Sequence, residues 1–119
     1  MATKERRQEN RIGISFPVEC TLLPDRKKVF YTVSRDLSMG GVRILTEDFV
    51  SPGQDIKLSI NLINALAEVK AQVAWCNKRS YSEQYYVGLK FDEINEKNKS
   101  NLGKFIDKVN YFVDLYGKK

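Results

Sequence analysis

Three arginines lie close together near the start of the chain, in the stretch RRQENR at positions 6–11. A guanidinium group is planar and permanently charged, and it can bind a phosphate or a guanine edge through two parallel hydrogen bonds. It can also stack on a base. Arg6, Arg7 and Arg11 are therefore candidates for binding an anionic ligand that contains phosphate. The alternative is a basic tail that stays in solvent.

A second polar stretch, DLSMGG at positions 36–41, separates two apolar runs that are typical of strands. Asp36 and Ser38 are alternate residues, so they point the same way in an extended backbone. The carboxylate can accept two N–H groups from a guanine edge, and the hydroxyl can bind a phosphate oxygen. Gly40 and Gly41 permit positive φ angles and a close approach of a ligand to the backbone. The alternative is a hairpin turn in which Asp36 and Ser38 bind nearby amides.

Two periodicities describe the elements that must position these stretches. Alternation of apolar and polar residues, typical of half-buried strands, occurs in residues 12–22, 29–34, 42–45, 56–62, 69–75 and 85–91. An amphipathic helix is then indicated by apolar residues at positions 102, 105, 106, 109, 112, 113 and 116. Asn95 or Ser100 can cap its start. We predict a mainly β protein, a six-stranded antiparallel small β-barrel with a C-terminal amphipathic α-helix.

Trp75 ends one of the predicted strands near the barrel rim, where its indole can stack on a guanine. The alternative is core packing, because Trp75 continues the apolar face of Val69 and Val73. Arg35 and Arg43 flank the DLSMGG stretch, where they either add positive potential or are solvated strand residues.

Composition and charge limit the classes of function. The chain has 119 residues, 42% of them hydrophobic, and a net charge of +5. This suits one globular domain, and the basic N-terminal third favours an anionic partner. No apolar run is long enough to span a membrane, and the N-terminus lacks the apolar segment of a secretory signal. We therefore expect a cytoplasmic protein without membrane insertion.

The usual residues of catalysis and metal binding are scarce. The chain contains no histidine, which is the commonest general acid–base residue. Its two cysteines, Cys20 and Cys76, lie within apolar strand-like runs and are interpreted as reduced packing residues. No P-loop and no nucleophile–base pair is present. We therefore expect no enzyme activity, no metal site and no cofactor.

The two polar stretches together resemble the signature of the PilZ domain family. Arg7 and Arg11 form an Arg-x-x-x-Arg motif, and Asp36, Ser38 and Gly41 form an Asp-x-Ser-x-x-Gly motif. About 25 residues of strand, turn and strand separate the two motifs. The later strands and the helix also resemble successive PilZ elements, so the resemblance covers positions 6 to about 113.

The resemblance implies that the ligand is cyclic di-GMP, a bacterial second messenger. In that family the arginine motif is a switch arm that folds over the ligand and contacts phosphates and the Hoogsteen edge of guanine. The Asp-x-Ser-x-x-Gly motif holds a guanine and a phosphate on the barrel surface. An arginine at the position of Arg6 is associated with a stacked pair of ligand molecules rather than one.

We predict residues 1–11 to be a flexible basic N-terminal arm with the RRxxxR switch, and residues 12–119 to be the barrel and helix. Ordering of the arm on ligand binding would change the surface that a partner meets. By family analogy, that partner is a protein effector in motility, adhesion or exopolysaccharide machinery.

Two other functions stay open. A small basic barrel with tyrosines in its connections can bind single-stranded nucleic acid, although the modest net charge makes a DNA or RNA partner unexpected. A PilZ-like adaptor can also bind protein without a nucleotide. Loss of the motif residues would mark such an adaptor, and all five are present.

Overall fold

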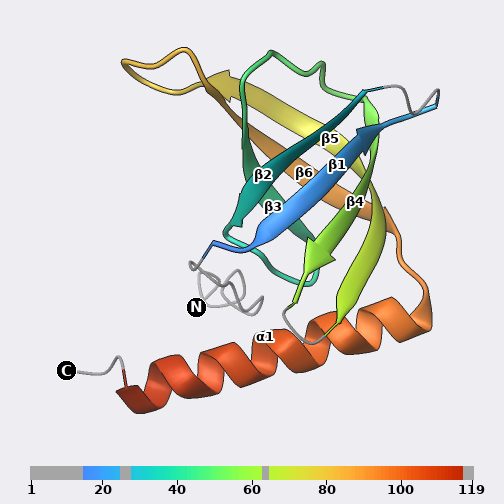
Figure 1. Ribbon diagram of the computed structural model, residues 1–119, viewed down its shortest axis with the longest axis vertical. Helices are drawn as coiled ribbons and strands as arrows, with labels where there is room; N and C mark the ends of the chain where they lie inside the picture. Colours follow the sequence, from blue (N-terminus) through green and yellow to red (C-terminus); the bar gives the residue numbers. More distant parts are fainter. Residues whose placement is uncertain (1–14, 25–27, 63–64, 117–119) are drawn as a thin grey trace, which may run out of the picture.

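The computed structural model describes residues 15–24, 28–62 and 65–116 (Figure 1). Within these ranges the chain forms a closed antiparallel barrel of six strands, followed by one helix, so the predicted fold class is confirmed. The elements are β1 Pro17–Leu22, β2 Val29–Arg35, β3 Gly41–Thr46, β4 Asp55–Asn61, β5 Leu66–Lys78, β6 Tyr85–Glu93 and α1 Glu96–Tyr116. The predicted arm, residues 1–11, and the start of the predicted first strand lie outside the described residues.

The strand order around the barrel is β1-β2-β3-β6-β5-β4, and pairing of β1 with β4 closes it. Four of the neighbouring pairs are consecutive in sequence, whereas β3 pairs with β6 across a long separation. That pairing brings the DLSMGG loop, between β2 and β3, beside β6. The amide of Phe91 donates a hydrogen bond to the carbonyl of Gly40 at 3.0 Å, which ties the loop to the end of β6.

The core fills the barrel because alternate strand residues point inward. In β4, for example, Ile56, Leu58 and Ile60 are fully buried. The same holds for Val18 and Cys20 in β1, as the alternation predicts. Both cysteines are free thiols, which agrees with their interpretation as packing residues.

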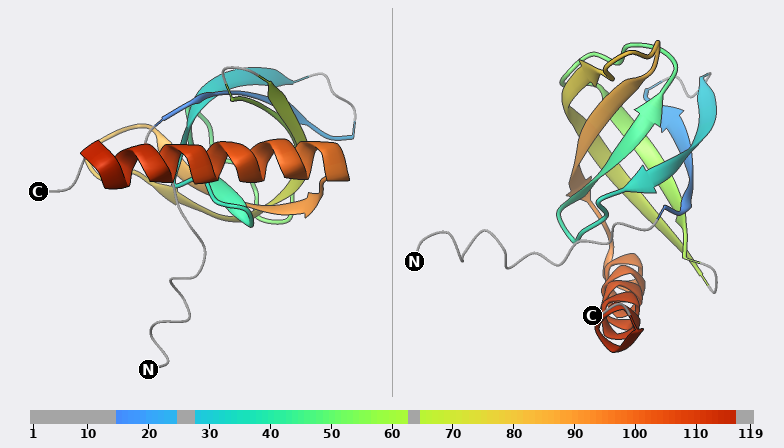
Figure 2. Two further views of the ribbon diagram at one scale, coloured as in Figure 1. Left: turned by 90° about the horizontal axis from the view of Figure 1, so that it is seen from below. Right: turned by 90° about the vertical axis from the view of Figure 1, so that its left-hand side faces the viewer.

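The helix α1 crosses one end of the barrel (Figure 2, left). Its start is capped by Asn95, whose side-chain Oδ1 accepts a hydrogen bond from the amide of Asn98 at 2.8 Å. Leu102 and Ile106 of α1 are buried in the hydrophobic core. The ring of Phe105, also on α1, packs edge-on against that of Phe16, with 4.8 Å between the ring centroids. In the part of the chain that the structure covers, no helix has the length and apolar character needed to cross a membrane.

The thiol of Cys20 makes stability depend on pH. Burial, with a smaller effect of the nearby Glu19 carboxylate, raises the pKa of Cys20 to about 12. In the unfolded chain the thiol ionises near its ordinary pKa of 9.0, while the folded thiol stays protonated. The unfolded state therefore binds fewer protons between pH 9 and 12, and stability falls there by up to about 1.4 kcal/mol per pH unit.

We expect urea unfolding between pH 8 and 10.5 to show this loss in the wild type and a shallower decline in Cys20→Ala. The alanine variant is less stable at every pH because it leaves a small cavity. The two proteins are therefore compared by the slope of the free energy of unfolding against pH. Equal slopes for the two proteins would show that Cys20 ionises as readily when folded as when unfolded.

Candidate functional site

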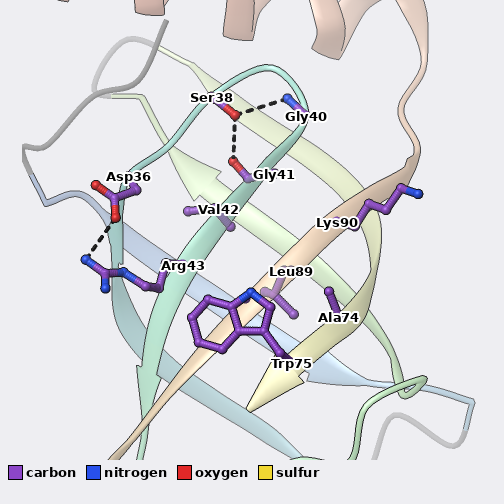
Figure 3. Close-up of a pocket in the computed structure, with 11 residues that line it drawn as sticks. Asp36, Ser38, Gly40, Gly41, Val42, Arg43, Ala74, Trp75, Leu89 and Lys90 are labelled. Atoms are coloured by element: carbon purple, nitrogen blue, oxygen red, sulfur yellow. Dashed lines mark hydrogen bonds and ion pairs between the residues drawn. The ribbon is translucent and has the colours of Figure 1, made fainter. Parts of the chain in front are cut away.

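A pocket of about 520 Å³ lies on the barrel surface beside the DLSMGG loop (Figure 3). It extends from that loop across β3 and β6 to the bulged part of β5. It is lined by Asp36, Ser38, Gly40, Gly41, Val42, Arg43, Ala74, Trp75, Gly88, Leu89 and Lys90. The pocket therefore brings together the predicted site residues from positions 36 to 41 and Trp75.

Ser38 organises the loop between β2 and β3. Its amide donates to the carbonyl of Gly41 at 2.9 Å, and its Oγ accepts a hydrogen bond from the amide of Gly40 at 3.2 Å. The neighbouring Leu37 is fully buried and anchors the loop to the core. The turn interpretation thus accounts for part of the role of Ser38, and the same turn shapes the rim of the pocket.

Asp36 adopts a left-handed backbone conformation, with a φ of 50°. Aspartate tolerates this region better than most residues. Gly40 and Gly41, whose residue type permits a positive φ, do not adopt one. Of the glycines in the described ranges, only Gly53 has one.

Gly41 is needed for a different reason, which is the close contact between β3 and β6. A Cβ atom on Gly41 would collide with the backbone carbonyl oxygen of Leu89. The motif glycine therefore sets the spacing of two strands that form the floor of the pocket.

The carboxylate of Asp36 is paired with Arg43 on β3. Oδ2 of Asp36 lies 2.8 Å from Nη2 of Arg43, and the guanidinium packs over the ring of Tyr86 at 4.6 Å from its centroid. Arg43 is thus a half-buried, oriented residue, in contrast to the solvated strand residue that was one interpretation of the sequence. A ligand that uses the Asp36 carboxylate must share or replace this ion pair.

Trp75 lies on the outside of the barrel because β5 contains a bulge. Val73 is buried, but the pairing with β6 shifts between Val73 and Trp75. The shift reverses the alternation, so Cys76 packs against the core and Trp75 is 40% exposed. Core packing of Trp75 is therefore wrong, and β5 continues beyond it to Lys78.

Gly88 on β6 makes room for the indole. It pairs with Trp75 across the strands, and a Cβ atom at Gly88 would collide with Nε1 and Cε2 of the indole ring. One face of Trp75 therefore packs on the β6 backbone, and the exposed part of the ring borders the pocket. Stacking of a base on such a ring contributes about 1–3 kcal/mol.

The charge of the pocket suits an anion. Asp36 and Arg43 neutralise each other, and Lys90 on the other side of the pocket is exposed and adds a positive charge. Among the residues with described side chains, no group of three or more histidine, cysteine or acidic residues is placed to hold a metal ion. A flat aromatic face, a carboxylate and two cations can together bind a base and a phosphate.

Sequence reasoning missed Gly88 and Lys90 and gave Arg43 little weight. A glycine within an alternating strand is a signal for a close contact, and Gly88 in YYVGLKF fits that pattern. Lys90 carries no comparable signal because exposed lysines are common on strands. The predicted arginines Arg6, Arg7 and Arg11 lie outside the described residues.

Comparison with known proteins agrees with this fold. The family model described as the PilZ domain matches residues 5–108. No curated protein matches the sequence. Among solved structures, the PilZ domain with c-di-GMP of YcgR from Escherichia coli has a TM-score of 0.71 and 18% identity, covering 96% of this chain and 99% of that chain.

Two further similar structures are longer proteins. Bacillus subtilis inhibitor of motility (MotI/DgrA) has a TM-score of 0.75 and 22% identity, over 89% of this chain and 51% of that chain. The K. pneumonia MrkH–c-di-GMP complex has a TM-score of 0.70 and 15% identity, over 95% and 55%. This chain therefore spans about half the length of these two proteins. At such identities, the similarity to these solved structures shows the fold alone. The family model matches most of the sequence, and this match shows that the chain belongs to the PilZ domain family.

Proposed function

We propose that this chain is a cyclic di-GMP receptor that signals to a protein partner. The observation that carries the proposal is the meeting of Asp36, Ser38 and Trp75 in one surface pocket. Cyclic di-GMP offers two guanines and two phosphates, and the pocket offers an aromatic face, a carboxylate and positive charge. The YcgR and MrkH structures were both solved with c-di-GMP, which supports the same ligand class here.

The proposed bound state uses each group differently. One guanine stacks on the exposed part of Trp75, and a guanine N–H edge binds the carboxylate of Asp36. A phosphate lies near Lys90 and the loop amides. Because Asp36 is already paired with Arg43 at 2.8 Å, the guanine competes with that guanidinium, which is then free to turn to a phosphate.

The arginine arm completes the site in this proposal. Arg7 and Arg11 bind phosphate and guanine from the side that the barrel leaves open, and Arg6 supports a second, stacked ligand molecule. The arm is then ordered only when the ligand bridges it to the barrel. The ordered arm offers a partner a surface that the free protein does not have.

Calorimetric titration of cyclic di-GMP into the full chain, with GTP as the control, tests the proposal. We expect saturable binding with a dissociation constant in the micromolar range or below, and none with GTP. The stoichiometry distinguishes one ligand from two, and Arg6→Ala should reduce a value of two to one. No heat at millimolar cyclic di-GMP would reject the receptor function and leave the protein adaptor.

Trp75 provides a direct optical test of the stacked base, since it is the single tryptophan of the chain. Titration with cyclic di-GMP should quench its fluorescence. Trp75→Ala should weaken binding by about 5- to 150-fold, which corresponds to the loss of one base stack. Trp75→Phe should keep most of the affinity, because it keeps an aromatic face. Equal affinity of Trp75→Ala and the wild type would remove Trp75 from the site.

A further inference from the structure

A second pocket, of about 530 Å³, opens between β2 and β3. We call it the β2–β3 groove, and its apolar lining consists mainly of Phe30, Tyr31, Val33, Leu45, Phe49 and Val50. The two strands are close together near the DLSMGG loop and separate toward the end of the barrel that lies away from α1 (Figure 2, right). The groove shares no lining residue with the pocket beside the DLSMGG loop, so the two are different surfaces.

The groove exists because the ladder between β2 and β3 is short. In the described part of the two strands, the paired residues are Ser34 with Ile44 and Arg35 with Arg43, and no pair follows. The Oγ1 of Thr32 donates to the carbonyl of Leu45 at 2.7 Å, in place of a further backbone pair. From Val29 to Val33, β2 pairs with β1 only. From Val29 to Tyr31, the edge of β2 thus faces the groove without a ladder to β3.

The outward face of β2 is apolar, although solvent surrounds it. Val29, Tyr31 and Val33 are 43%, 75% and 37% exposed, and Phe49 at the rim is 56% exposed. A contiguous exposed apolar patch marks an interaction surface. The edge and the face of β2 are therefore both available to the same partner.

The charges at the groove favour a basic partner. Lys28 is paired with Asp48 at 3.1 Å, so it does not neutralise the other acids. The carboxylate of Glu47 accepts a hydrogen bond from the neutral amide of Gln84, and that of Glu19 accepts one from the hydroxyl of Tyr31. Neither Glu19 nor Glu47 forms an ion pair with another described residue. Glu47 thus lines the groove without a countercharge. Glu19 lies on β1, on the far side of Tyr31 from the groove.

We propose that the β2–β3 groove binds an extended segment of a protein partner, which pairs with the free edge of β2 as an added strand. Alternate apolar side chains of the segment enter the groove and cover Tyr31 and Phe49. A lysine or arginine residue beside them binds Glu47 at the rim. Main-chain hydrogen bonds give such a complex its affinity, and the alternate side chains give its specificity. The proposal does not depend on which nucleotide the other pocket binds.

A display library of random twelve-residue peptides tests the proposal, with the full wild-type chain as the target. We expect enrichment of peptides with alternating apolar residues, basic ends and no central proline. Synthetic copies should bind the wild type at least 10-fold more tightly than the double variant Tyr31→Thr/Phe49→Ser. They should bind Tyr111→Ala as tightly as the wild type, because Tyr111 is a comparably exposed aromatic residue on α1.

Three outcomes would overturn the proposal. They are the absence of any enriched family, enrichment of acidic or helix-forming peptides, and equal binding to the double variant. Sedimentation adds a fourth: self-association of the wild type that Tyr31→Thr abolishes would mean that a second copy of the chain occupies the groove. If the double variant unfolds, amide exchange of the wild type replaces it, and an unchanged exchange rate in β2 on peptide binding would equally reject the added strand.

Discussion

Replacement of Arg11 by alanine should reduce the affinity for cyclic di-GMP by about 30- to 1000-fold and leave the melting temperature of the free protein unchanged. A guanidinium that binds phosphate and a guanine edge has the character of a hot spot, for which truncation costs about 2–4 kcal/mol. The buried core of the described residues begins at Phe16, after the arginine motif. Arg7→Ala should behave in the same way. Calorimetric titration and thermal unfolding measure the two effects separately.

Lys4→Ala is the matched control for this prediction, because it removes one positive charge from the same segment outside the motif. If the arginines act only through long-range attraction, Lys4→Ala and Arg11→Ala weaken binding equally, and added salt removes the difference from the wild type. A specific contact predicts less than a 3-fold effect for Lys4→Ala. A melting temperature that falls by several degrees in Arg11→Ala without ligand would contradict a switch arm and indicate a structural role.

The fold could be predicted from the sequence because each element follows one simple period. Alternate residues of β4 from Ile56 to Ile60 are apolar, and a closed barrel with a filled interior buries that face. The helix could be predicted from its apolar residues at helical spacing. Asn95, which caps the helix, was one of the two predicted capping residues. Pairing of β3 with β6 could not be read from the pattern, because a period of two defines a face and leaves the neighbouring strand undefined.

The candidate site could be predicted only in part, because its geometry depends on departures from the period. The bulge in β5 reverses the alternation before Trp75, and no sequence signal at Ala74 marks it. The ion pair of Asp36 with Arg43 depends on β3 and the loop meeting at one point. The motif residues were candidates from their chemistry as well as from the family resemblance, whereas the structural reason for a glycine at position 41 required the contacts of the fold.

Gly41→Ala tests whether the motif glycine has a structural role, because Gly41 lies at the close contact between β3 and β6. Its added Cβ would collide with the carbonyl oxygen of Leu89, a backbone atom that cannot move without separating β3 from β6. We expect a loss of about 3 kcal/mol in the free energy of unfolding, measured by urea in the absence of ligand. Ligand affinity should fall as well, because both strands form the floor of the pocket.

Gly103→Ala is the matched control, and its expected effect has the opposite sign. The added Cβ would lie 3.8 Å from Sδ of Met39, an ordinary contact, and alanine favours an α-helix over glycine by up to about 1 kcal/mol. A Gly41→Ala variant with wild-type stability and no ligand binding would contradict strand spacing and assign Gly41 to direct contact with the ligand. A destabilised variant that regains cyclic di-GMP binding at low temperature would instead place the role of this motif glycine in the barrel.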